Sequence, residues 1–272
     1  MRFPGRSMLL AALAASSPAL AADVGETYGE PDPGRFSFEA GATVLIVPKY
    51  EGSDDYRVIG FPVVIPSFGS GDGEGLGDRL TVRGVDDVRF ALFRQGIFEV
   101  GPAGGWTFGR EEDDAERLEG LGDVDGGVTL GAYGAINLDP FFVDVAYLQQ
   151  ITGDTDGGQL KFNGGLRTEV APKLDMTASV GATYANSDYM NSFFSVTPEQ
   201  SLESGLDAFT AEDGFKSVSA DLEFDYGFND KLTLSASAGY SRLVGDAADS
   251  PIIETENQFR GSLGFTYAFG PF

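Results

Sequence analysis

The chain has 272 residues without histidine or cysteine, and its 42 Asp and Glu against 18 Lys and Arg give a formal net charge of −24. The missing histidine and cysteine exclude imidazole and thiolate catalysis, disulfides and the usual zinc and iron–sulfur ligands. So acidic a chain is a poor partner for nucleic acid, because phosphate binding needs clustered positive charge. We therefore expect a non-enzymatic protein with no cofactor and no nucleic-acid partner.

The N-terminus has the three parts of an export signal. Arg2 and Arg6 precede an apolar stretch, and Ala19-Leu-Ala21 matches a small-residue cleavage site. The apolar stretch is shorter than the ~20 residues that a membrane-spanning helix needs. We expect residues 1–21 to be a cleaved signal peptide, 22–35 a short periplasmic segment and 36–272 the folded domain.

The rest of the chain alternates between apolar and polar residues with the period of a β-strand. Between residues 174 and 184, Leu, Met, Ala, Val and Tyr share one parity, whereas Asp, Thr, Ser and Gly share the other. This pattern predicts eleven strands, which in chain order lie at 36–47, 57–66, 79–92, 97–108, 123–137, 140–150, 159–171, 174–185, 215–228, 231–243 and 258–269.

Two folds satisfy such a pattern. A soluble β-sandwich or lipocalin-like barrel turns the apolar face inward, whereas a transmembrane barrel turns it toward lipid. Long segments, aromatic residues near their ends, and tight connections that alternate with long ones favour the membrane barrel. A single-chain bacterial barrel has an even number of strands, and the pattern is least clear before residue 97. We therefore expect an all-β antiparallel transmembrane β-barrel of twelve strands, with ten as the alternative.

Four stretches of the chain resemble the MipA/OmpV family of outer-membrane proteins, which is named for MltA-interacting protein. They begin with PKYEGSDDY at 48–56, FGREEDD at 108–114, DYM at 188–190 and GYSRL at 239–243. The resemblance implies a barrel in the outer membrane of a Gram-negative cell, in contact with lipid and lipopolysaccharide. It also implies a role in holding murein-synthesising and murein-hydrolysing enzymes together, a murein synthase and a periplasmic lytic transglycosylase.

Three of these stretches supply candidate contacts for a partner. They lie in connections at the barrel rim, where acidic and aromatic side chains can dock another protein. The candidates are Tyr50, Glu51, Asp54, Asp55, Tyr56, Arg110, Asp113, Asp114, Tyr189 and Met190. Each group also has a structural interpretation: a turn around Gly52, a solvated acidic loop at 110–116, and packing of the long 186–214 connection over the barrel mouth.

The polar residues that alternate with the apolar ones would line the lumen of a membrane barrel, and they suggest a second function. This face carries mostly acidic residues, namely Glu39, Glu99, Asp125, Asp144, Lys161, Arg167, Glu169, Asp221, Glu223 and Asp225. Such a lining either passes small cations or closes the lumen with ion pairs. Two functions therefore stand side by side: a scaffold for murein enzymes, which the resemblance implies, and a channel or uptake barrel for small solutes.

Overall fold

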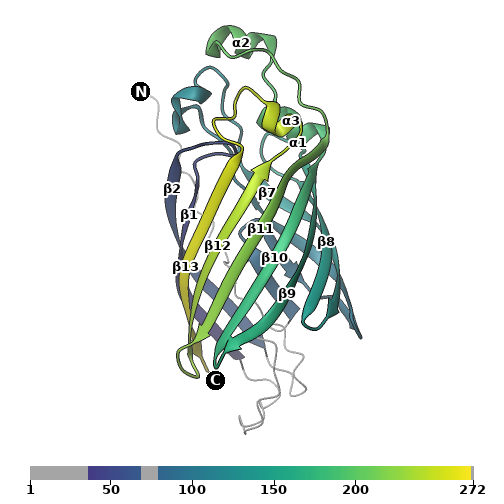
Figure 1. Cartoon of the computed structure of the whole chain (residues 1–272), viewed down its shortest axis with the longest axis vertical. Helices are drawn as coiled ribbons and strands as arrows, with labels where there is room; N and C mark the ends of the chain where they lie inside the picture. Colours follow the sequence, from purple (N-terminus) through teal and green to yellow (C-terminus); the bar gives the residue numbers. More distant parts are fainter. Residues whose placement is uncertain (1–35, 69–78, 271–272) are drawn as a thin grey trace.

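The computed structural model describes residues 36–68 and 79–270, which form one antiparallel sheet curled around a long axis (Figure 1). The described residues form thirteen strands: β1 (Phe36–Pro48), β2 (Tyr56–Phe68), β3 (Leu80–Gly84), β4 (Asp87–Phe90), β5 (Phe93–Gln95), β6 (Phe98–Thr107), β7 (Gly127–Leu138), β8 (Phe141–Gln150), β9 (Gly158–Ala171), β10 (Leu174–Ala185), β11 (Gly214–Gly227), β12 (Leu232–Leu243) and β13 (Asn257–Phe269). The expected signal peptide and the 22–35 segment lie outside the described residues.

The strand order is that of an outer-membrane barrel. From β6 to β13 each strand pairs with its neighbour in sequence, and β13 then pairs with β1, which brings the first and last strands together. The hydrogen-bonded path ends at β2 on one side and at β3 on the other. Because β4 and β5 both pair with β6, they occupy one place, and the thirteen segments fill twelve positions. The expected all-β antiparallel architecture, with about twelve strands, is confirmed for the described residues.

Two of the expected strands differ by more than two residues, and the short strand β5 was not expected. The segment 79–92 was expected as one strand, but it folds into a hairpin of β3 and β4. Val85 and Asp86 form the turn, and aspartate is a common turn residue because its side chain bonds nearby backbone. The segment 123–137 begins as a strand only at Gly127, so Asp125 lies in a connection instead of lining the lumen.

The exposure along β8 identifies the face that meets lipid. Val143 is 51% and Tyr147 45% exposed, whereas Ala146 and Leu148, on the other parity, are buried. Exposed apolar residues recur along the outer face of the other long strands. A soluble barrel would bury this face, and a transmembrane barrel presents it to the bilayer. The outer face of the sheet therefore has the apolar character that contact with a lipid bilayer requires.

The two ends of the barrel carry different connections. At one end the chain turns at 139–140, 172–173 and 228–231, and at the other it runs through 49–55, 108–126, 151–157, 186–213 and 244–256. The described helices lie in the long connections: η2 (Glu112–Asp114), η3 (Glu116–Leu118), α1 (Ser187–Phe194), α2 (Pro198–Ser204) and α3 (Asp246–Asp249). None of them has the length and apolar character to cross a membrane. In Figure 1, α1 and α3 lie close over the strand ends, and α2 stands farther out.

Candidate functional site

Four of the long connections meet in a buried apolar cluster at the barrel mouth. Tyr50, Leu118, Leu121, Val196 and Ile252 come from the connections after β1, β6, β10 and β12, and they pack together. These strands stand at different positions around the barrel, so their connections have to reach across its mouth to touch. We call this assembly, together with α1 and α3, the cap.

Helix α1 forms the centre of the cap. The side chain of Asn186 accepts a hydrogen bond from the backbone N–H of Tyr189 (3.0 Å), which starts the helix at Ser187. The helix then buries Tyr189, Met190, Phe193 and Phe194 against the upper ends of β10 and β12 and against α3. The rings of Tyr189 and Phe193 stack with centroids 4.5 Å apart.

A buried charge lies directly under α1. Lys216, near the start of β11, is 5% exposed and forms an ion pair with Glu51. The Tyr189 hydroxyl donates to Glu51 (3.0 Å) and accepts from Lys216 (3.2 Å). Burial and the neighbouring Glu51 carboxylate raise the pKa of Tyr189 well above its ordinary value of 10.0. Tyr189 therefore stays protonated and keeps donating to Glu51 throughout the physiological range.

Two more of the candidate contacts are internal to the cap. Tyr50 is 5% exposed, and its hydroxyl donates to the carbonyl of Ile252 (3.2 Å). Burial raises the pKa of Tyr50 above its usual range. Met190 is 1% exposed and packs in the core of the cap. In this state of the protein neither side chain is free to meet a partner.

Arg110 is also enclosed by the cap. It is 3% exposed, and its Nη2 donates to the carbonyl of Ser192 at 3.5 Å. Burial lowers the pKa of Arg110 below that of a free guanidinium. Arg110 thus ties the connection after β6 to α1.

The other candidate contacts stay on the outside. Asp54, Asp55 and Tyr56 are exposed at the rim, where Lys49 pairs with Asp55 at 2.8 Å. Asp113 and Asp114 lie in η2, Asp113 exposed and Asp114 half-buried. Within the described ranges, no three carboxylates are grouped so as to hold a metal ion. The candidates therefore separate into a buried set that builds the cap and an exposed set that can meet another molecule.

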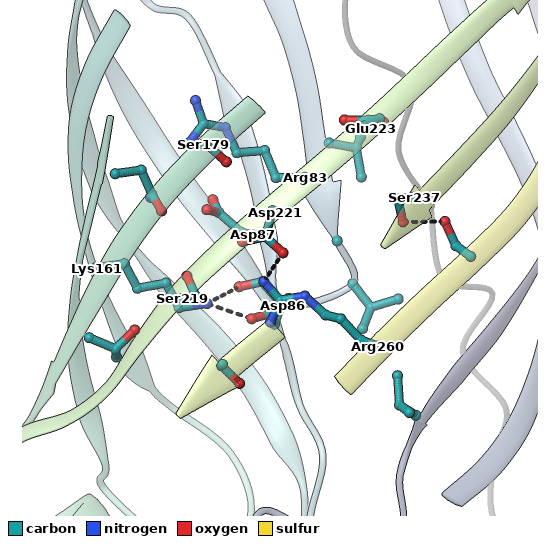
Figure 2. A pocket seen from close by; sticks show the side chains of 18 of the residues that line it. Arg83, Asp86, Asp87, Lys161, Ser179, Ser219, Asp221, Glu223, Ser237 and Arg260 are labelled. Carbon is teal, nitrogen blue, oxygen red and sulfur yellow. Dashed lines mark hydrogen bonds and ion pairs between the residues drawn. The ribbon is translucent and has the colours of Figure 1, made fainter. Parts of the chain in front are cut away.

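Below the cap the lumen contains a cavity of about 940 Å³ (Figure 2). Part of its wall, contributed by β10 to β13, carries hydroxyl side chains such as Ser179, Ser219 and Ser237. Charged side chains line the cavity from the β3–β4 hairpin and β9, and also from β11 and β13. Ten Lys and Arg line the cavity, against six Asp and Glu. The expected acid-rich lining was wrong, because the strand pattern did not reveal that the arginines of β3 and β4 turn inward.

The β3–β4 hairpin supplies much of this charge by folding into the lumen. Figure 2 shows Lys161 of β9 directed toward Asp86 at the hairpin turn, and the two form an ion pair. Lys161 Nζ also donates to the Asp86 carbonyl at 3.3 Å. Arg260 of β13 forms a second ion pair with Asp221 of β11.

The hairpin is held by a buried ion-pair network around Asp144 of β8. Arg83 contacts one carboxylate oxygen of Asp144 at 2.7 Å and Arg89 contacts the other at 2.8 Å. Arg89, which is 2% exposed, also binds Asp87 through two bonds of 2.7 and 2.8 Å and lies over the ring of Tyr133. Charged hydrogen bonds of this kind are the stronger ones in proteins.

Two glycines of β6 make room for the hairpin. A Cβ on Gly101 would lie 1.8 Å from the carbonyl oxygen of Phe90, and one on Gly105 would lie 2.5 Å from the carbonyl carbon of Asp86. Only glycine allows backbone to approach so closely. Sequence reasoning did not identify this network. Two features of the sequence could have indicated it: the closely spaced charged residues Arg83, Asp87 and Arg89, and the two glycines of β6, which fall on the same face of that strand.

A curled antiparallel sheet with an apolar outer face, a charged lumen and long connections at one end defines the class of outer-membrane β-barrels. The family model described as MltA-interacting protein MipA matches residues 40–269. The chain belongs to this family, and it is a protein of the outer membrane. That outcome confirms the resemblance carried by the four motifs.

Curated relatives carry outer-membrane names. The chain is 25% identical over 159 residues to outer membrane protein OmpV of Vibrio cholerae and 24% identical over 159 residues to Omp26La of Vibrio anguillarum. Each match covers 58% of this chain and 61% of the relative. The match to YiaT of Escherichia coli K12 is 28% identical over 97 residues, 36% of this chain and 39% of that protein. The chain thus spans less than two thirds of these relatives.

Solved barrels resemble the chain only distantly. OmpT of Vibrio cholerae aligns with a TM-score of 0.39 at 10% identity, over 88% of this chain and 98% of that one. The NanC porin aligns with a TM-score of 0.40 at 10% identity, over 85% of this chain and 98% of that one.

Proposed function

We propose that this barrel is a non-enzymatic scaffold that recruits periplasmic murein-hydrolysing and murein-synthesising enzymes to the outer membrane. The observation that carries the proposal is the match of residues 40–269 to the family described as MltA-interacting protein. The cap and the ion-paired hairpin support the proposal, because both occupy space that an open channel would need, and a scaffold does not need an open channel.

The short-turn end is the part of the barrel that a periplasmic enzyme would meet. Outer-membrane barrels place their short turns in the periplasm and their long loops outside. Asp139, Lys173, Asp230 and Lys231 are exposed in these turns and supply charge for docking. The rim candidates Asp54, Asp55 and Tyr56 lie at the opposite end, where lipopolysaccharide is the available partner.

Affinity purification from cross-linked envelopes tests this proposal, with an unrelated barrel of similar abundance as the control. We expect selective recovery of a lytic transglycosylase or a murein synthase. The double variant Lys173→Glu and Lys231→Glu should reduce recovery several-fold, whereas Asp55→Lys, at the opposite end, should leave it unchanged. Recovery of nothing beyond the control barrel would refute the scaffold.

A small-solute channel or uptake barrel is the second candidate. The polar cavity of about 940 Å³ in the lumen favours it, because a scaffold needs no such space. A channel predicts step-like conductance in a planar bilayer, and the scaffold predicts none.

A further inference from the structure

The charge of the lumen opposes the charge of the whole chain. The chain carries a net charge of −24, yet ten of its 18 Lys and Arg line a single cavity, where only six acids accompany them. Lining cations therefore outnumber lining acids by four, and an excess of enclosed positive charge raises the local concentration of anions, because low-dielectric walls focus the field. The cavity therefore favours an anionic occupant in a chain that is otherwise acidic.

Arg167 of β9 is the cavity-lining cation best placed to bind such an anion. Its guanidinium stacks 4.0 Å from the centre of the Phe142 ring and forms no ion pair with any described residue. Arg83 lies over the same ring at 5.4 Å, but its charge is matched by Asp144. Arg167 thus has a fixed position and no ion-pair partner among the described residues, and the carboxylates of Glu99, Asp144 and Glu223 act on its charge without forming an ion pair with it. It is half-buried and lines the cavity.

Hydroxyl groups surround the same space. Thr177 of β10 lies directly opposite Arg167 in the strand register, and both line the cavity. Figure 2 shows Ser179, Ser219 and Ser237 on the wall that continues from it. Serine and threonine hydroxyls both donate and accept, so they match a ligand that itself carries hydroxyl groups.

We propose that the lumen is a binding site for a small hydroxylated organic anion, a sugar acid or a sugar phosphate. Arg167 binds the anionic group, which a guanidinium can hold through two parallel hydrogen bonds. The serine and threonine wall binds the hydroxyls. This site lies inside the barrel and is separate from the scaffold role. A test of anion binding is therefore independent of the test of enzyme recruitment.

Isothermal titration of the detergent-purified, folded chain at low salt tests the proposal with three probes. Gluconate carries a carboxylate, glucose 6-phosphate carries a phosphate, and glucose has similar hydroxyls without charge. We expect at least one of the two anions to bind at least tenfold more tightly than glucose. The better anion identifies the acid group that the site prefers.

Matched variants locate the binding. Arg167→Gln should weaken the better anion at least tenfold, whereas Arg242→Gln, an exposed arginine of β12 that does not line the cavity, should leave it unchanged. If the Arg167 variant does not fold, as judged by heat-modifiable gel mobility, inorganic phosphate should still compete with the anion on the unmodified chain. Equal binding of anion and glucose, no binding of either anion, or an unaffected Arg167→Gln would overturn the proposal.

Discussion

Lys216 is a buried cation whose neutralisation depends on one carboxylate, that of Glu51. Removing one partner of a buried ion pair costs roughly 3–5 kcal/mol, because the other charge is left without compensation. The Glu51 side chain is 28% exposed, so solvent screening reduces this cost to about 2 kcal/mol. Glu51→Gln should therefore weaken the cap while leaving the strands paired.

Amide hydrogen exchange of α1 measures this effect. In the Glu51→Gln variant we expect α1 to exchange about tenfold faster or more. Asp55→Asn is the matched control, because the pair of Asp55 with Lys49 is more exposed and lies in the same connection. Exposed pairs contribute about 0–1 kcal/mol, so this variant should exchange almost as the parent does. Equal exchange of α1 in both variants would contradict the structural role of Glu51.

The raised pKa of Tyr189 gives the cap a dependence on alkaline pH. The folded state holds the phenolic proton more tightly than the unfolded state does. The resulting stabilisation is complete below the ordinary pKa of 10.0 and is lost as the pH rises above it toward the folded-state value. We expect Tyr189 to stay protonated in the folded chain at pH 10.5.

Tyrosinate absorbance tests this expectation by comparing the parent chain with Tyr189→Phe. The two folded proteins should gain the same absorbance up to pH 10.5, because Tyr189 does not titrate in that range. In denaturant the parent should exceed the variant by about a tenth, since the chain has ten tyrosines. A difference of that size already present in the folded proteins would show that Tyr189 titrates normally.

The position of the β3–β4 hairpin against β6 requires a residue without a side chain at Gly105. The backbone N–H of Trp106, the one tryptophan of the chain, donates to the carbonyl of Val85 in the hairpin turn at 2.8 Å. Gly105→Ala places a methyl group against the backbone of Asp86, and such overpacking costs roughly 1–3 kcal/mol. We expect the hairpin to move away from β6 and the Trp106 fluorescence to shift.

Gly134→Ala on β7 is the control for this change, because a Cβ there meets only a side-chain atom of Val100 at 3.7 Å. Its fluorescence and unfolding midpoint in urea should match those of the parent. An unchanged spectrum and midpoint for Gly105→Ala would mean that the hairpin does not need the close approach to β6.

The long strands and the hairpin show which elements sequence can predict. Strand β10 matches its expected range of 174–185, because alternation is a local property that one strand displays by itself. The inward fold of β3 and β4 depends on Asp144 and Lys161, which lie more than fifty residues farther along the chain. In the same way, the motif residues Glu51 and Tyr189 could be singled out, but their partner Lys216 is an ordinary strand residue in the sequence. The inward fold of the hairpin and the ion pair under α1 both depend on contacts between segments that are distant in sequence, and a local pattern does not reveal such contacts.

The whole molecule is a barrel that is capped at one end and crossed by an ion-paired hairpin. We propose that it acts by holding partners. The exposed apolar face fixes it in the bilayer, and the two ends differ in connection length. A barrel of this kind can bind solute in its lumen without passing a continuous current.

Conductance across a planar bilayer distinguishes a closed barrel from an open one. The folded parent chain should produce no step-like conductance beyond the protein-free bilayer, since cap and hairpin both obstruct the lumen. A variant that combines Glu51→Gln with Gly105→Ala loosens both obstructions and should produce transient steps, which shows that silent barrels had been inserted. Regular, long-lived steps from the parent chain would contradict the account and make the channel the leading function.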